Sequence, residues 1–184
     1  MDSIIAAARE MQLSEVALNV LATARTPRSA VEALLDAELA ADALGLLARL
    51  LPRRYAVAWL CQCVRADEPA RSDDRAGVEL AERWVREPDD TRRRDALAYA
   101  QAHRFRTVGA WVAAAAGWSG GNLAPPGSEI VAVPTEFMTA RAAAAAITHL
   151  AARASTRFAQ RRAGFVRVAL DLLGPPERID GGIR

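Results

Sequence analysis

The chain has 184 residues, of which 52% are hydrophobic and 5% aromatic, and 24 basic against 22 acidic residues give a formal net charge of +2. So large a hydrophobic share excludes an intrinsically disordered chain, and the near balance of charge excludes a strong overall attraction to nucleic acid or anionic membrane. Every basic residue is arginine, so no lysine can form a Schiff base or serve a phosphate-binding loop.

The fold class follows from the kind of apolar residue that is present. Alanine leads, followed by leucine and valine, and alanine is the best helix former and a poor strand residue. Uneven element lengths without a fixed repeat predict an all-α, irregular bundle of about seven or eight helices with one long Gly/Pro-rich loop. We expect one domain, residues 1–174, and a flexible C-terminal tail, residues 175–184.

The first part of the chain shows helices separated by prolines. Apolar residues at three- and four-residue spacing predict one face of a first helix: Leu13, Val16, Ala17, Val20 and Leu21. Thr26 followed by Pro27 predicts the start of a second, because the hydroxyl can cap free amides and proline suits the first helical position. A further apolar set, residues 44–51, either continues that helix or forms another before Pro52.

Residues 53–65 form the predicted central helix. Apart from a tyrosine and two thiols, only Gln62 is polar between Arg54 and Arg65, so the helix should be buried on nearly all sides. Cys61 and Cys63 point to nearly opposite sides of such a helix, which excludes a mutual disulfide or a shared metal. We interpret them as packing residues of a protein in a reducing compartment.

The rest of the chain has four predicted helices that begin at Ser72, Thr91, Arg106 and either Thr135 or Thr139, and a last one over residues 156–173. Residues 119–134 interrupt them as the long ordered loop. Within it Ile130-Val131-Ala132-Val133 is too short and too close to proline for a regular strand, and we expect it to be extended loop that packs on the bundle.

One motif suggests catalysis. Gly117-Trp118-Ser119-Gly120-Gly121 fits the G-x-S-x-G pattern, in which a serine lies on a turn between a strand and a helix. Here a predicted helix precedes the serine and a proline-rich loop follows, so the context is reversed. A serine hydrolase that uses Ser119 and His149 is therefore the alternative. We favour a turn in which the glycines end the helix, and Ser119 and Asn122 bond to free backbone groups.

Neither a metal, a cofactor nor a catalytic residue is predicted. Two histidines and two badly spaced cysteines do not make a zinc site. Arginines cluster at residues 53–54, 92–94 and 157–162, with acids near them, so we predict ion-paired, solvated helix faces and keep nucleic-acid binding as an alternative. The acid at Asp2 does not suit a signal peptide, and the apolar runs are shorter than the ~20 residues of a membrane span, which predicts a cytoplasmic protein.

Partner binding is the favoured function. Tryptophan is a common interface anchor, and proline segments are ordered before they bind. The candidate partner-binding residues are those of the helix end and the loop: Trp111, Trp118, Ser119, Asn122, Leu123, Pro125 and Pro126. Core packing is favoured for Trp59 and Trp84. The expected partner is another protein, and a homodimer is possible.

Three stretches carry a family resemblance: Arg53–Cys61, Trp111 through Ala124-Pro125-Pro126, and Thr139-Ala140-Arg141-Ala142. They resemble an uncharacterised bacterial family of alanine-rich, all-helical proteins found in or near type VI secretion gene clusters. The resemblance covers about residues 51–152. It implies a cytoplasmic accessory role, such as an adaptor or chaperone that holds an effector or spike component, and it brings no catalytic residues.

Overall fold

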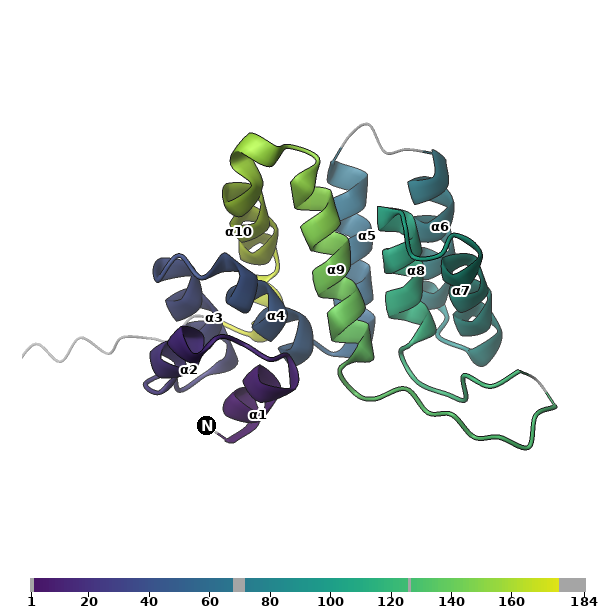
Figure 1. The fold of residues 1–184 in the computed structure, drawn as a ribbon, viewed down its shortest axis with the longest axis horizontal. Helices are drawn as coiled ribbons and strands as arrows, with labels where there is room; N and C mark the ends of the chain where they lie inside the picture. Colours follow the sequence, from purple (N-terminus) through teal and green to yellow (C-terminus); the bar gives the residue numbers. More distant parts are fainter. Residues whose placement is uncertain (1, 68–71, 126, 176–184) are drawn as a thin grey trace, which may run out of the picture.

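The computed structural model describes residues 2–67, 72–125 and 127–175. Over these residues the protein is all-α, with ten α-helices and no strand (Figure 1). The helices are α1 (Asp2–Glu10), α2 (Glu15–Leu21), α3 (Pro27–Asp36), α4 (Ala40–Leu50), α5 (Arg53–Ala66), α6 (Ser72–Arg86), α7 (Asp90–Ala102), α8 (Val108–Gly117), α9 (Met138–Ala152) and α10 (Phe158–Val168), with 3-10 turns η1 (Ser155–Arg157) and η2 (Leu170–Leu173).

The class is as predicted, but seven or eight helices is too few. Helix α1 is not among the predicted helices, and the break between α3 and α4 is one of two alternatives that the sequence allows. Both helices end at non-glycine residues with left-handed backbone, Gln12 (φ 57°) and Glu38 (φ 59°), which a search for glycine and proline cannot find. Of the predicted first apolar face, Ala17 and Leu21 are buried in α2, but Val16 is 60% exposed and Leu13 lies before the helix begins.

Helix starts follow the capping rules only in part. Thr26 caps α3 as predicted, in a capping box with Ser29 and with Pro27 behind it. Neither predicted residue caps α9, which begins at Met138 without a side-chain cap. Thr139 is instead buried, and its hydroxyl donates to the carbonyl of Ala115 in α8 at 3.2 Å.

The helices form two halves in Figure 1. One half holds α1 to α4 and α10, the other α5 to α9, and α4 and α10 pack against α9 where the halves meet. In the second half α8 is surrounded by α5, α6, α7 and α9, and nine of its ten residues are buried. The central helix is therefore α8. The predicted one, α5, is well buried but keeps Arg54, Gln62 and Arg65 exposed.

Glycine allows the neighbours of α8 to approach closely. A Cβ atom on Gly77 of α6 would lie 2.2 Å from the carbonyl oxygen of Gly109, and one on Gly117 would lie 2.7 Å from Cβ of Leu97 in α7. Both helices therefore pack against α8 at backbone contact, and side chains larger than hydrogen do not fit at these crossings.

The two cysteines are packing residues, as predicted. Both are free and buried in α5, and burial raises the pKa of each thiol to about 12. In the part of the chain that the structure describes, no helix combines the length and the apolar character that a membrane span requires.

Candidate functional site

The loop of residues 119–134 is the main irregular element, and it extends beyond the lower end of the bundle in Figure 1. It begins where the amide of Trp118 donates to the carbonyl of Ala114 at 2.8 Å and ends α8. Gly121 follows with a left-handed backbone (φ 68°), and a Cβ atom there would lie 2.8 Å from Nε of Arg93. The predicted turn is confirmed for Gly120 and Gly121, which have positive φ. Gly117 is instead the last helical residue of α8, and the Ser119 hydroxyl makes no hydrogen bond among the described residues.

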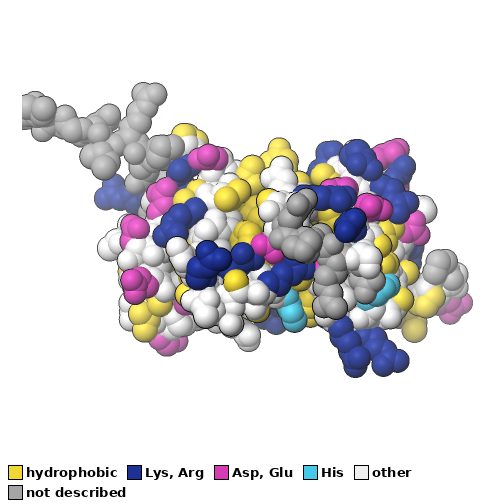
Figure 2. Space-filling view, turned by 90° about the horizontal axis from the view of Figure 1, so that it is seen from above, with side chains coloured by type: hydrophobic (Ala, Val, Ile, Leu, Met, Phe, Trp, Pro, Cys, Tyr) yellow, Lys and Arg dark blue, Asp and Glu magenta, His cyan; other side chains and the backbone are white. Residues whose placement is uncertain are grey.

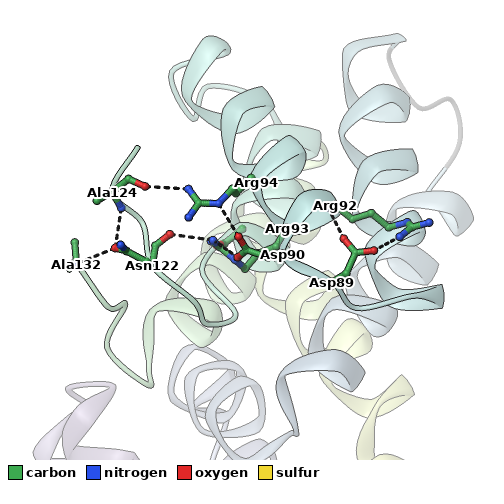
Figure 3. A network of polar contacts seen from close by, with 9 residues as sticks. Asp89, Asp90, Arg92, Arg93, Arg94, Asn122, Ala124 and Ala132 are labelled. Carbon is green, nitrogen blue, oxygen red and sulfur yellow. Dashed lines mark hydrogen bonds and ion pairs between the residues drawn. The ribbon is translucent and has the colours of Figure 1, made fainter. Parts of the chain in front are cut away.

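Arginine side chains hold the first arm of the loop, residues 119–124, by hydrogen bonds to its carbonyls, several of which Figure 3 shows. Arg93, which is 3% exposed, donates to the carbonyls of Gly117 (2.9 Å) and Asn122 (3.0 Å). Arg94 donates to the carbonyl of Ala124 at 2.9 Å. From α5, Arg53 adds a hydrogen bond to the carbonyl of Ser119 at 2.7 Å.

Asn122 connects the two arms of the loop. Its Oδ1 accepts hydrogen bonds from the amides of Ala124 (3.0 Å) and Ala132 (2.8 Å), and its Nδ2 donates to the carbonyl of Ile130 at 3.1 Å. The amide of Leu123 also donates to the carbonyl of Ala132 at 2.7 Å. The second arm of the loop, residues 130–134, is therefore fixed to the first arm, which the arginines hold. We call residues 130–134 the returning arm. We define Arg93, Arg94 and Asn122 as the loop brace.

Of two carboxylates at the start of α7, Asp90 orients the two arginines of the brace and Asp89 caps the helix. Asp90 accepts from Arg93 at 2.6 Å and from Arg94 at 2.7 Å, and the hydrogen bonds from Arg94 and then Arg93 hold its pKa below the ordinary value. Asp89 caps α7 by accepting from the amide of Arg92 at 2.8 Å, and this bond is the main cause of its lowered pKa. Both carboxylates are ionised at neutral pH, so Asp90 is available to pair with both arginines of the brace.

The returning arm exposes large apolar side chains. Ile130 is 69%, Val131 75% and Val133 68% exposed. The expectation that this segment packs on the bundle is therefore wrong. Among residues 130–134 only Pro134 is buried, and the backbone of Ala132 bonds to Asn122 and Leu123 of the loop itself.

The predicted site residues take different positions. Pro125 is exposed, Leu123 and Ser119 are half-buried, and Pro126 lies outside the described residues. Asn122 bonds to free backbone groups of the loop, as one of its two predicted roles required.

Trp111 and Trp118 share one half-buried aromatic cluster. The ring of Phe105 lies 5.5 Å from that of Trp111 and 5.4 Å from that of Trp118, and the two indole rings are 6.3 Å apart. Phe105 reaches them from a turn in which it and Arg104 both have left-handed backbone. Both tryptophans therefore combine core contacts with an accessible edge. Trp59 and Trp84 are buried, as predicted.

Comparison with protein families identifies the chain. A family model matches residues 30–173, most of its length. The chain belongs to DUF6931, a family of unknown function. No curated protein and no solved structure matches it. The match confirms membership of an uncharacterised family and extends beyond the stretch of resemblance. It carries no link to type VI secretion.

In this DUF6931 protein Ser119 and His149 are not brought together. Thr139 near the start of α9 bonds Ala115 near the end of α8, and Trp111 near the start of α8 lies 6.3 Å, ring to ring, from His149 near the end of α9. The two helices are thus antiparallel (Figure 1). His149 lies ten residues beyond Thr139, which is about 15 Å along the axis and away from Ser119.

Eight arginines of this DUF6931 protein have a carboxylate partner among the described residues, and others donate to backbone carbonyls instead. Carboxylate partners are present for Arg28, Arg49, Arg65, Arg92, Arg93, Arg94, Arg153 and Arg161. In Figure 2 arginine and acidic side chains lie among one another on the face that is seen. The predicted ion pairing is found for the 92–94 cluster and for Arg161. The prediction fails for Arg53 and Arg54, which donate to backbone carbonyls, and Arg93 is buried and not on a solvated face. Within the described ranges no three potential metal ligands gather.

Sequence reasoning missed the loop brace and the exposed row of the returning arm. Arg93 and Arg94 stand in a helix of ordinary charge pattern, and nothing local shows that they reach a loop about 30 residues away in sequence. The row did leave a signal. Three β-branched residues outside any helix, next to proline and glutamate, are unusual in a chain of this composition.

Proposed function

We propose that this DUF6931 protein is a non-enzymatic protein–protein interaction module whose docking element is the loop of residues 119–134. The observation that carries the proposal is the exposure of Ile130, Val131 and Val133 on a loop with fixed hydrogen bonds. Exposed neighbouring apolar side chains are common at sites where another protein binds.

The loop brace supports docking because it orders the loop before a partner arrives. A flexible loop would lose conformational freedom on binding, and each immobilised residue would weaken the complex. Here Arg93 and Arg94 already fix the carbonyls of Asn122 and Ala124. Binding therefore begins from an ordered surface.

The aromatic cluster lies beside this element. Trp118 ends α8 directly before the loop, and its half-buried ring can contribute to the same interface. Tryptophan is enriched among the residues that contribute most of the binding energy at protein interfaces. The interface that we propose thus includes Trp118 and the exposed row, while Asn122 and Ser119 act through the shape of the loop.

The cellular role that we propose is that of a cytoplasmic accessory protein, an adaptor or chaperone for an effector or spike component of a type VI secretion system. Family resemblance alone supports this role. Identification of the genes beside this one provides a first test, since an adaptor of this kind is expected among secretion genes.

The experiment that tests docking compares two triple variants. Serine at Ile130, Val131 and Val133 removes the exposed row. The matched control has serine at three other exposed apolar residues, Val16, Val168 and Leu172. Affinity purification from the native cell followed by mass spectrometry is expected to lose the partner with the first variant only. Retention of the partner by the first variant, or equal loss from both, would show that the loop is not the docking element.

A further inference from the structure

The backbone of the returning arm has an alternating pattern of hydrogen bonds. At Ile130 the amide donates to Oγ of Ser128 and the carbonyl accepts from Asn122. At Ala132 the amide donates to Asn122 and the carbonyl accepts from Leu123. The amides and carbonyls of Val131 and Val133 have no hydrogen bond within the residues that the structure describes.

This alternation matches the hydrogen-bond pattern of an edge strand, although the described residues form no regular strand. Successive residues of an extended chain turn their amides and carbonyls to opposite edges. Ile130 and Ala132 use the inner edge, so Val131 and Val133 present the outer edge. On the other side of the loop, Arg93 and Arg94 already occupy the carbonyls of Asn122 and Ala124. The outer edge of Val131 and Val133 is therefore where a further strand can be added.

We infer that the partner docks by strand addition: an extended, basic peptide segment of another protein pairs with the outer edge of Val131 and Val133. This inference rests on the proposed function and specifies its mode. Main-chain hydrogen bonds would supply affinity, and β-branched side chains opposite the valines would supply specificity.

Charge indicates a basic partner. Residues 119–137 contain two acids, Glu129 and Glu136, and no arginine. Glu136 is paired with Arg49, whereas exposed Glu129, directly before the apolar row, has no ion pair within the described part of the chain. An arginine or lysine of the incoming segment can pair with Glu129, and such charges mainly favour encounter and correct register.

A second copy of this chain suits the edge less well. If two copies paired antiparallel with Val131 of one opposite Val133 of the other, Glu129 would face the neutral Thr135 of the second copy. Residues 119–137 contain no arginine, so the second copy offers Glu129 no opposite charge. A basic segment supplies that charge across the strand pair.

A defined probe tests the mode directly. The probe is a capped octapeptide of alternating valine and threonine with an arginine at each end, titrated into the labelled full chain and followed by amide NMR and hydrogen exchange. We expect saturable shifts and slower exchange at the amides of Val131 and Val133, with little change at Ala132, which is already bonded. Saturable binding that leaves both valine amides unchanged, or no binding at all, would overturn strand addition.

Two substitutions at Val131 distinguish the contribution of its backbone amide to probe binding from that of its side chain. Val131→Pro removes the outward amide and no hydrogen bond of the described residues, and we expect it to weaken the probe about tenfold or more. The control Val131→Thr keeps the amide and the branched shape, and its affinity should stay within about twofold, with the hydrogen-bonded amide of Ala132 reporting an intact loop in both. Equal affinity of the proline and threonine variants would overturn the inference.

The native partner distinguishes this inference from the proposed function. If the partner is lost with the triple serine variant but kept by Val131→Pro, the loop docks through its side chains and strand addition is wrong. If both variants lose it while Val131→Thr keeps it, both proposals are supported. If neither variant loses it, both are overturned.

Discussion

Helix α8 and the loop that follows it are adjacent in sequence and are stabilised in opposite ways. In α8 apolar and small residues are buried, and glycines let the neighbouring backbones touch, as at Gly77 against Gly109. In the loop the large apolar residues are exposed, and arginine and asparagine side chains fix the backbone. Close packing thus determines the bundle, and polar contacts determine the shape of the surface that we propose for docking.

The largest expected effect concerns the close packing of α6 against α8. Gly77→Val places a branched side chain against the backbone of Gly109, and we expect a loss of about 3 kcal/mol in the free energy of unfolding. Gly164→Ala is the control, since a Cβ atom there has no neighbour within 4 Å, and it should stabilise α10 by up to about 1 kcal/mol. Denaturant unfolding measures both. Equal effects of the two substitutions would show that the α6–α8 contact does not depend on glycine.

The next effect concerns the loop brace. Arg93→Met keeps much of the buried stem but leaves the carbonyls of Gly117 and Asn122 without a donor, so we expect a loss of about 2 to 3 kcal/mol. Arg94→Met, at a more exposed position with one loop carbonyl, should lose about 1 kcal/mol. Chemical denaturation and hydrogen exchange at Ala132 report stability and loop order. A larger effect for Arg94 than for Arg93 would contradict the role of the buried guanidinium.

A smaller effect is expected from pH. The pKa of Asp90 is lower in the folded protein than its ordinary value, since Arg94 and Arg93 favour the carboxylate. Its contribution to stability is therefore complete above the ordinary pKa of about 4 and is lost as the pH falls through the lowered folded value. The difference in unfolding free energy between the wild type and Asp90→Asn should shrink in that range. A difference that stays constant from pH 7 to pH 2 would show that Asp90 does not act through its charge.

The smallest effect on stability is expected from a cysteine introduced in the loop, whose accessibility to a thiol reagent can be compared with that of the buried native cysteines. Val131→Cys changes an exposed residue and should alter the unfolding free energy by less than about 0.5 kcal/mol. Its thiol should react with a thiol reagent at once at neutral pH. Cys61 and Cys63 should not react in the folded chain, because they are buried and the pKa of each is raised to about 12. Rapid labelling of the native cysteines would contradict the packing of α5.

The sequence was most informative where structure is local. Thr26 with Pro27 predicted the start of α3, the glycines after Trp118 predicted its turn, and the 61/63 spacing predicted two unlinked thiols. It failed where a helix ends without glycine, as at Glu38, and where a residue is used by a distant element. Thr139 resembles a helix cap in sequence, but its hydroxyl bonds across to α8.

The candidate site divides in the same way. Sequence alone identified residues 119–134 as the irregular element and included Trp118 and Asn122 in the site. It assigned Ile130–Val133 to the surface of the bundle, because apolar residues usually pack when helices are near. Nothing in residues 130–133 shows that Asn122 will hold the arm by its backbone and leave the side chains in solvent.

Composition, capping residues and glycines therefore determined the class, many of the helices and the place of the loop, since each depends on neighbours within a few residues. Only the tertiary structure decided that α8 is the central helix, that Arg93 is buried, and that Val131 and Val133 present an open edge. These features depend on contacts between residues far apart in the chain, such as Gly77 with Gly109 and Arg93 with Asn122. Local propensity carries no record of such pairs.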